Sequence, residues 1–420
     1  NYAQIEENPV KRAAEQPVST FSIDVDTGSY ANVRRFLNSG RLPPRDAVRV
    51  EELINYFDYD YPLPDGRQPP FRVSTELAPT PWNPKTLLMA VGIKGYELPK
   101  TKLPPANLVF LIDVSGSMEA PDKLDLLKPA LKLLVRQLRP EDKVAIAVYA
   151  GAAGMVLEPT AGGQKSKIEA ALDRLSAGGS TNGGAGIQLA YNLAREGFVK
   201  DGVNRVIVAT DGDFNVGTVN FEALKNLVET QRKSGIALTT LGFGTGNYND
   251  RLMEQLADAG NGNYAYIDTL QEANKVLVEQ MSATLLTIAK DVKIQIEFNP
   301  ARVEEYRLIG YENRVLRRED FNNDAVDAGD IGAGHTVTAL YEIALKGSGG
   351  NLTEPLRYGQ AAVTDSAARG DEIAFLRLRY KQPNSDVSQL QEWPIRRDQI
   401  VKDWKETNER FRFAAAVAGF

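Results

Sequence analysis

The chain has 420 residues, which predicts two or three domains at about 150 residues each. Its 49 basic and 55 acidic residues give a formal net charge of −6. This charge argues against a broad nucleic-acid-binding surface, because such domains usually have a pI above about 9. The chain has no cysteine and one histidine, His335, which excludes disulfides, iron–sulfur clusters and zinc sites built from Cys or several His. Any bound metal is therefore expected to be held by oxygen.

The N-terminal region has little local patterning. Residues 1–20 are polar and lack hydrophobic periodicity, which predicts a flexible tail. The sequence begins at Asn1, and it leaves open whether a signal peptide or lipid anchor has been removed. No stretch of the chain approaches the 18 or more apolar residues that a membrane-spanning helix needs.

Two short segments follow before the main alternating region. Residues 21–65 predict a strand and two helices, the first capped by Ser29 and the second by Asp46. Residues 66–104 change to alternating strands separated by a turn-rich stretch, which predicts a β segment.

Residues 105–290 alternate apolar strands with amphipathic helices. Short apolar runs between such helices are typical of a mainly parallel sheet covered on both faces. We therefore predict a doubly wound α/β domain, closed by a helix over 269–288. The expected strands are 107–112, 144–149, 205–209, 236–243 and 264–267.

The C-terminal part returns to strands. Alternating apolar residues over 291–398 predict an antiparallel β-sandwich with one wet face on each sheet. Because strands flank the α/β block on both sides, we expect 66–104 to pair with 291–380, with the α/β domain inserted between them. Residues 399–420 predict the start of a final helix that the chain end truncates.

Polar residues gather where the predicted strands end. Asp113, Ser115 and Ser117 follow the first strand of the α/β block, and Asp211 follows the third. Thr181 lies in a glycine-rich loop between them. Ligands bind at the carboxyl ends of parallel strands, and an oxygen-only set of this kind suits Mg²⁺ or Mn²⁺ first and Ca²⁺ next. Neutral hydroxyl ligands leave the ion's charge poorly compensated, so we expect a vacant position that attracts an outside carboxylate.

Other polar residues have plainer interpretations. Asp213 is either a residue behind the ligands or a turn residue, and His335 lies in a glycine-rich turn where a solvated role is expected. Asp24 and Asp26 resemble the start of a phosphotransfer motif with a nucleophilic aspartate. Because Gly28 replaces the residue such a motif needs, we interpret them as turn or cap residues, or as contacts to another domain.

The combined pattern resembles a known family. Asp113-x-Ser115-x-Ser117 after an apolar strand, Thr181 in a glycine-rich loop and Asp211 in Thr-Asp-Gly are similar in order and spacing to the metal-ion-dependent adhesion site of von Willebrand factor type A (VWA) domains. All parts of that motif are present in the sequence. The resemblance covers residues 105–290, and the flanking segments resemble bacterial VWA proteins of the cell envelope, many of them predicted lipoproteins.

The resemblance implies a non-enzymatic function. It implies metal-dependent adhesion, in which an Asp or Glu of a protein partner completes the metal shell, on a bacterial cell envelope or outside the cell. It implies no nucleic-acid partner, and membrane contact only through a lipid anchor. It also implies that ligand binding shifts the helix at 269–288, which leads into the β domain. The alternatives are a Mg²⁺-dependent hydrolase or phosphotransferase, and a VWA partner subunit of an AAA+ ATPase.

Overall fold

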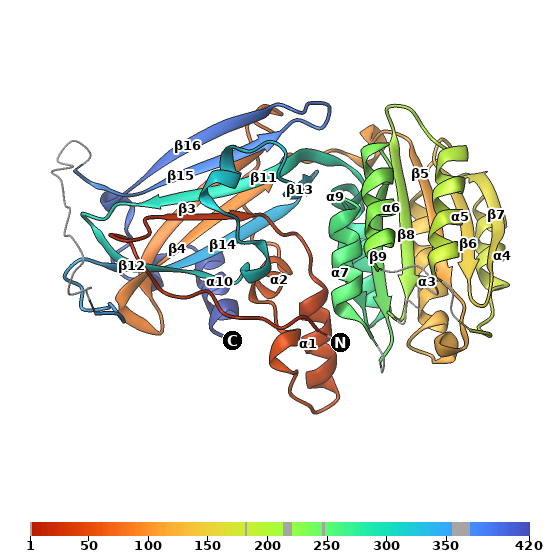
Figure 1. Cartoon of the computed structure of the whole chain (residues 1–420), viewed down its shortest axis with the longest axis horizontal. Helices are drawn as coiled ribbons and strands as arrows, with labels where there is room; N and C mark the ends of the chain where they lie inside the picture. The colour runs from red at the N-terminus through yellow and green to blue at the C-terminus, as the bar shows by residue number, and fades with distance from the viewer. Residues whose placement is uncertain (1, 181–182, 213–220, 246–247, 355–369) are drawn as a thin grey trace. The chain divides into compact units, whose positions relative to one another are not determined.

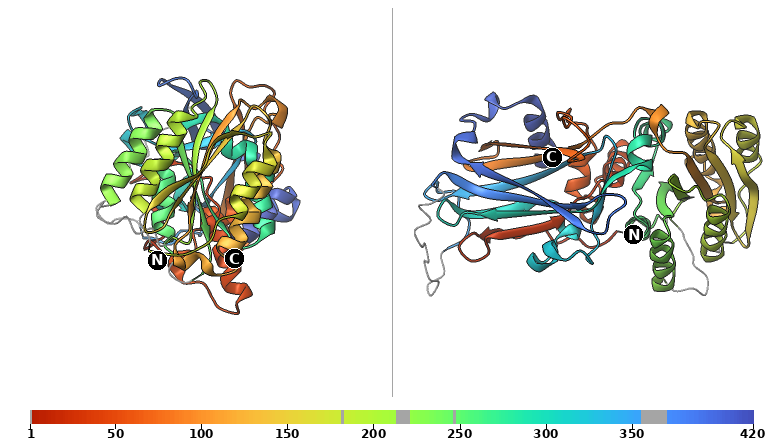
Figure 2. Two further views of the ribbon diagram at one scale, coloured as in Figure 1. Left: turned by 90° about the vertical axis from the view of Figure 1, so that its right-hand side faces the viewer. Right: turned by 90° about the horizontal axis from the view of Figure 1, so that it is seen from above.

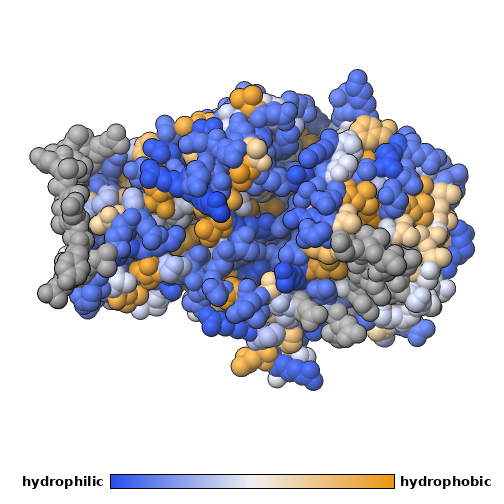
Figure 3. All heavy atoms as spheres, viewed as in Figure 1, coloured by the Kyte–Doolittle hydropathy of each residue, from blue (hydrophilic) through white to orange (hydrophobic). Residues whose placement is uncertain are grey.

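The computed structural model describes residues 2–180, 183–212, 221–245, 248–354 and 370–420 (Figure 1). It divides into two compact units. The α/β unit comprises Asn1–Gln4, Asp26–Ala47 and Leu98–Leu286, and the β unit comprises Ile5–Val25, Val48–Glu97 and Thr287–Phe420. No helix in the described ranges combines the length and apolar character that crossing a membrane requires. The face drawn in Figure 3 is mostly hydrophilic, with small scattered apolar patches.

The α/β unit is built on a six-stranded sheet with the order β10-β9-β8-β5-β6-β7. All neighbouring pairs are parallel except β6 and β7. This arrangement confirms the predicted doubly wound fold. The strands are β5 (Ala106–Asp113), β6 (Lys143–Tyr149), β7 (Ala153–Ala161), β8 (Val203–Thr210), β9 (Ala237–Phe243) and β10 (Tyr264–Ile267).

Helices cover both faces of this sheet (Figures 1 and 2). Because successive strand side chains point to opposite faces, β5 contributes Phe110 to the cluster under α3, α4 and α8, and Leu111 to the cluster under α5, α6 and α7. The central strand β5 is buried along its whole length. The helices are α3 (Leu124–Gln137), α4 (Lys165–Asp173), α5 (Gly183–Glu196), α6 (Phe221–Lys233), α7 (Asp250–Ala259) and α8 (Leu270–Asn274).

Two elements of this unit differ from the sequence prediction. The closing helix expected at 269–288 is interrupted, because a π-helical turn over Lys275–Glu279 separates α8 from α9 (Met281–Leu285). The strand β7 was not predicted, because its sequence contains Gly154, Glu158 and Pro159 and resembles a loop. Within the described residues it pairs only with β6, and an edge strand tolerates proline because one of its sides forms no ladder of hydrogen bonds.

The β unit contains two antiparallel sheets. In the first sheet, β4 pairs with β14 from Leu87 to Lys94, so segments before and after the α/β insertion share one sheet. The order of this sheet is β1 (Lys11–Arg12), β12 (Val303–Ile309), β14 (Thr336–Leu345), β4 (Asn83–Gly95), β3 (Phe71–Thr80). The second is β13 (Gly329–Gly332), β11 (Thr287–Phe298), β15 (Glu372–Lys381), β16 (Ser388–Arg396), with β2 (Val18–Ser22) also paired to β11.

Aromatic side chains join the two sheets face to face. Phe298 on β11 stacks on Tyr306 of β12 with ring centroids 4.0 Å apart. Phe71 on β3 meets Tyr380 of β15 at 4.8 Å. Contacts of this kind across two antiparallel sheets make the sandwich core (Figure 2).

Two helices, α2 (Val50–Asn55) and α10 (Glu409–Gly419), pack on the first sheet through Ile54 and Phe411. The final helix starts at Glu409 because the Asn408 side chain caps it by accepting from the Phe411 amide. Residues 399–408, which the sequence places in that helix, form short 3-10 turns and loop instead.

The N-terminal segment is more ordered than its composition predicts. Strand β2 pairs with β11 in register from Val18 to Ser22, and β1 pairs with β12. Residues 1–20 therefore contain β1 and the first three residues of β2 where the sequence predicts a flexible tail. A five-residue strand carries little local signal, and its partner lies about 275 positions away in the chain.

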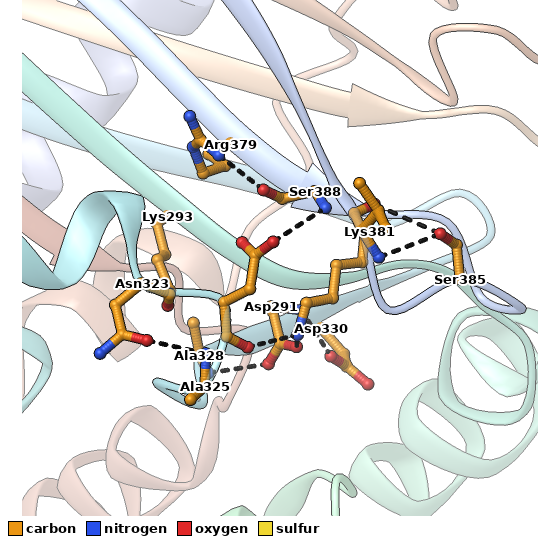
Figure 4. A network of polar contacts seen from close by, with 12 residues as sticks. Asp291, Lys293, Asn323, Ala325, Ala328, Asp330, Arg379, Lys381, Ser385 and Ser388 are labelled. Atoms are coloured by element: carbon orange, nitrogen blue, oxygen red, sulfur yellow. Dashed lines mark hydrogen bonds and ion pairs between the residues drawn. The ribbon is translucent and has the colours of Figure 1, made fainter.

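The start of β11 is held by a polar network (Figure 4). Asp291 has a left-handed backbone, φ 51°, and interrupts the register of β11 with β15. Its carboxylate accepts from Lys381 Nζ at 2.7 Å and from the Ala328 amide at 3.1 Å, while its own amide donates to Asp330 at 3.2 Å. These bonds fix the backbone five residues after the α/β unit ends.

The segment Asp26–Ala47 belongs to the α/β unit. The helix α1 (Gly28–Asn38) packs on β10, and Asp26 Oδ1 accepts from the Tyr264 amide at 2.8 Å. Arg34 forms an ion pair with Glu272 at 2.8 Å. The unit of 21–65 expected from the sequence is thus divided between the two units, with Asp24 and Asp26 on opposite sides of the division.

The contact between α1 and β10 leads to a prediction for Gly28→Ala. Helix propensity alone favours alanine by about 1 kcal/mol. A Cβ at Gly28, however, would lie 2.2 Å from Tyr264 Cε1, and overpacking of this kind costs about 1–3 kcal/mol. We expect thermal unfolding of Gly28→Ala to show a lowered stability. Gly154→Ala is the matched control, because a Cβ there meets nothing closer than 4.0 Å. Equal stabilities of the two variants would contradict the prediction.

Candidate metal centre

Asp113 ends β5 and is held by groups from three strand ends. Its Oδ1 accepts from the Ser115 amide at 2.9 Å. Its Oδ2 accepts from the Thr210 hydroxyl at 2.8 Å and from the Tyr149 hydroxyl at 3.2 Å. Thr210 ends β8 and Tyr149 ends β6, so the parallel register brings all three side chains to one edge of the sheet. The Asp113 carboxylate is therefore fixed in orientation.

Burial controls the protonation of this cluster. Asp113 is fully buried, and desolvation raises the pKa of its carboxyl, as does the charge of Asp211, although hydrogen bonds from Ser115 and Thr210 lower it. Burial and then the Asp113 charge raise the pKa of the Tyr149 phenol well above its ordinary value. Tyr149 therefore stays protonated and acts as a donor to Asp113.

The two serines of the motif present a pair of adjacent hydroxyls. Ser115 is buried and Ser117 is exposed, and their Oγ atoms lie 3.1 Å apart. Oxygens that share an edge of an octahedral Mg²⁺ shell lie about 2.9 Å apart, given metal–oxygen bonds of about 2.0–2.1 Å. The spacing of the hydroxyls therefore fits two neighbouring positions on one hard cation.

The glycine-rich loop reaches the same edge. The Gly116 amide donates to the Gly179 carbonyl at 3.0 Å, and the Gly178 amide donates to the Val114 carbonyl at 2.8 Å. Gly179 has a φ of +85°, which favours glycine. Thr181 and Asp213 lie outside the described residues, so the role of Thr181 as a ligand and the completeness of the motif stay predictions.

Asp211 follows β8 and is engaged by a lysine. Lys123 Nζ donates to Asp211 Oδ2 at 2.8 Å and to the Ser117 carbonyl at 2.8 Å. Both side chains are almost completely buried. The lysine thus joins the loop that carries the serines to the strand end that carries the second aspartate.

Four of the predicted site residues form one connected network, namely Asp113, Ser115, Ser117 and Asp211. Sequence reasoning missed Lys123, Tyr149 and Thr210. For Tyr149 and Thr210 a signal existed, since Tyr149 ends a predicted strand beside the motif and Thr210 directly follows another. For Lys123 the local sequence Pro121-Asp122-Lys123 resembles an ordinary turn before a helix.

The donor set is suited to a hard cation that is bound largely by hydroxyls. The described residues contain no group of three or more His, Asp or Glu placed to hold a metal, so the carboxylates alone do not make a site. The serine pair with Asp113 and Asp211 behind it supplies only oxygen, which favours Mg²⁺ or Mn²⁺.

The remaining polar residues of the sequence analysis belong elsewhere. His335 lies in the β unit, where its Nδ1 accepts from the Gly332 amide at 3.3 Å. Asp24 forms an ion pair with Arg314 at 3.2 Å. Asp26 accepts from the Tyr264 amide, and both residues belong to the α/β unit.

Comparison with known proteins assigns the chain to a family. The model of the von Willebrand factor type A domain matches residues 107–280. Models described as von Willebrand factor and as the C-terminal part of YfbK match residues 1–90 and 283–420. The "Uncharacterized protein YfbK" of Escherichia coli is 50% identical over 425 residues, which cover 100% of this chain and 73% of that protein. The chain belongs to the YfbK family.

Two further proteins are similar to smaller parts of this YfbK family chain. A Synechocystis protein, "sll0103", is 30% identical and covers 50% of this chain and 50% of its own length. A solved von Willebrand factor type A structure from Catenulispora acidiphila is 16% identical, covers 85% of this chain and 79% of its own, and has a TM-score of 0.46. VWA domains commonly bind a divalent metal at the adhesion site and are generally non-enzymatic interaction modules. The α/β unit of this YfbK family chain is such a domain.

Proposed function

We propose that the α/β unit is a metal-dependent protein-binding module whose divalent-cation site captures an acidic side chain of a partner protein. The observation that carries the proposal is the pair of serine hydroxyls 3.1 Å apart. They belong to the same network as the carboxylates of Asp113 and Asp211, which already accept hydrogen bonds from other residues. When bound, a divalent cation would supply an open coordination position for an outside carboxylate.

The chain's own residues prepare this position. Both oxygens of Asp113 accept hydrogen bonds, and one oxygen of Asp211 accepts from Lys123. Their charges are therefore partly compensated before any ion arrives. Ser115 and Ser117 add no charge. The site is thus poorly able to neutralise a divalent ion by itself, which favours recruitment of a negative group from outside.

The partner and the ion follow from this chemistry. The partner is a protein that presents Asp or Glu, and the ion is Mg²⁺, with Mn²⁺ and Ca²⁺ as alternatives. We place the protein on the bacterial cell envelope or outside the cell, attached through a lipid anchor if it touches a membrane.

Binding of Mn²⁺ and acetate to the whole chain tests the proposal. Mn²⁺ serves as the probe of the site because its bound water accelerates water-proton relaxation, and acetate serves as a minimal carboxylate. We expect Mn²⁺ to bind, Mg²⁺ to compete with it, and acetate to lower the relaxation by displacing water. The double variant Ser115→Ala/Ser117→Ala should bind Mn²⁺ at least about tenfold more weakly.

Ser166→Ala is the matched control, since Ser166 is an exposed serine on α4. If the wild-type chain binds Mn²⁺ but acetate leaves the water-proton relaxation unchanged, the proposal that the site captures acidic groups is wrong. Turnover of phosphate or ester substrates with Mg²⁺ would favour a hydrolase instead.

A further inference from the structure

Lys123 has a position that the motif does not explain. It lies at the start of α3, where its carbonyl accepts from the amides of Leu126 and Leu127 at 3.1 and 2.8 Å. The apolar face of α3, including Leu127 and Leu131, is completely buried. The backbone of Lys123 is therefore anchored by the core.

The side chain of Lys123 is also confined. Gly244 follows β9 with a φ of +76°, and a Cβ there would lie 2.4 Å from Lys123 Cγ. The Gly244 carbonyl accepts from the Tyr266 hydroxyl at 2.6 Å, which holds this turn against the lysine stem. The ammonium group then donates to Asp211 and to the Ser117 carbonyl. Three separate segments thus direct one positive charge to the site.

The formal charges of the site show what this lysine changes. Asp113 and Asp211 alone carry two negative charges, which would cancel a divalent cation. With Lys123 the protein contributes one net negative charge, so the loaded site keeps one net positive charge. An ammonium in a buried setting acts strongly on neighbouring charges, because the local dielectric is low.

We propose that Lys123 is a specificity-determining residue that weakens cation binding and strengthens the binding of the incoming carboxylate. It does so by neutralising Asp211 and by adding its own positive charge. Lys123 also holds Asp211 and the Ser117 carbonyl in place. Its charge, however, is what lowers the affinity for the cation and raises the affinity for the carboxylate. This inference rests on the proposed function and deepens it.

Substitution of Lys123 in the whole chain tests the inference. For Lys123→Met we expect Mn²⁺ to bind at least about tenfold more tightly, and acetate to bind the Mn²⁺-loaded protein about tenfold more weakly. Isothermal titration with Mn²⁺ and water-proton relaxation with acetate measure the two affinities. Lys123→Gln, which keeps a donor but removes the charge, should show the same two directions if the methionine variant fails to fold.

Lys132→Met is the matched control, because Lys132 lies on the same helix and pairs with the exposed Asp173 at 2.5 Å. It should leave both affinities unchanged. A merely structural role for Lys123 would weaken Mn²⁺ binding, and that result overturns the inference. Tighter Mn²⁺ binding with unchanged acetate affinity overturns it as well. If the wild type binds Mn²⁺ and acetate and Lys123→Met has the same two affinities, the inference about Lys123 is wrong and the proposed function stands. If the wild type binds no Mn²⁺, both the inference and the proposed function are wrong.

Discussion

The Asp113→Asn variant is expected to bind Mn²⁺ about 100-fold more weakly than the wild type. Asp113 lies behind the two serine hydroxyls and supplies a buried negative charge to the site. Asparagine has nearly the same shape, and its oxygen can still accept from the Ser115 amide. Its NH2 group replaces Oδ2, so the Thr210 and Tyr149 hydroxyls must turn to accept from it. The substitution therefore removes the charge while the turn that places Ser115 is kept.

The same variant should keep or gain thermal stability. Burial raises the pKa of Asp113, which means that its ionised form is less favoured in the folded chain than in the unfolded chain. Weak Mn²⁺ binding together with a melting temperature at or above the wild-type value separates a metal defect from misfolding. Asp173→Asn serves as the control, because this carboxylate is 61% exposed. If Asp113→Asn binds Mn²⁺ with the wild-type affinity, Asp113 is not part of the metal site.

The β unit is expected to lose stability as the pH rises, because of Glu51. This residue lies on α2 with 1% exposure, and its Oε2 accepts from the Tyr311 amide at 3.0 Å. Burial, followed by the charges of Asp24 and Glu52, raises the pKa of the Glu51 carboxyl from 4.5 to about 8. The folded chain therefore retains a proton that the unfolded chain releases near pH 4.5.

The direction of the pH effect follows from this difference. Between the unfolded and folded pKa values only the folded state holds the proton, so stability is highest below the unfolded value and falls as pH rises toward 8. The slope is about 1.4 kcal/mol per pH unit, or roughly 4 kcal/mol between pH 5 and pH 8. Urea unfolding at several pH values measures it.

Glu51→Gln should flatten this dependence and raise stability at pH 8, with little change at pH 5. Glutamine can accept from the Tyr311 amide but does not ionise. Glu319→Gln provides the control, because Glu319 is an exposed glutamate of the same unit. A Glu51→Gln variant with the wild-type pH slope would show that another group causes the effect.

The α/β architecture and most of the site were predictable from local pattern. Apolar strands such as Asn107–Ile112 and helices with apolar residues three and four apart carry their own period. Asp113, Ser115 and Ser117 come just after one such strand, and Asp211 comes just after another. In a parallel sheet strand ends meet at one edge, so their convergence follows from their positions in sequence. The pairing of 66–104 with 291–380 was also predictable, because alternating strand patterns lie on both sides of the α/β block in the sequence.

The tertiary structure alone decided the rest. The pairing of Val18–Ser22 with β11 and the docking of α1 on β10 depend on partners far along the chain, so no local window contains their signal. The edge strand β7 pairs with the strand just before it, but its sequence lacks a strand pattern. Lys123 is the clearest case. Its own sequence indicates a solvated turn, and its placement on Asp211 arises only when the start of α3 meets the end of β8, 88 positions along the chain. Local periodicity records which face of an element is buried, whereas the neighbour of a single charged side chain depends on how those elements pack.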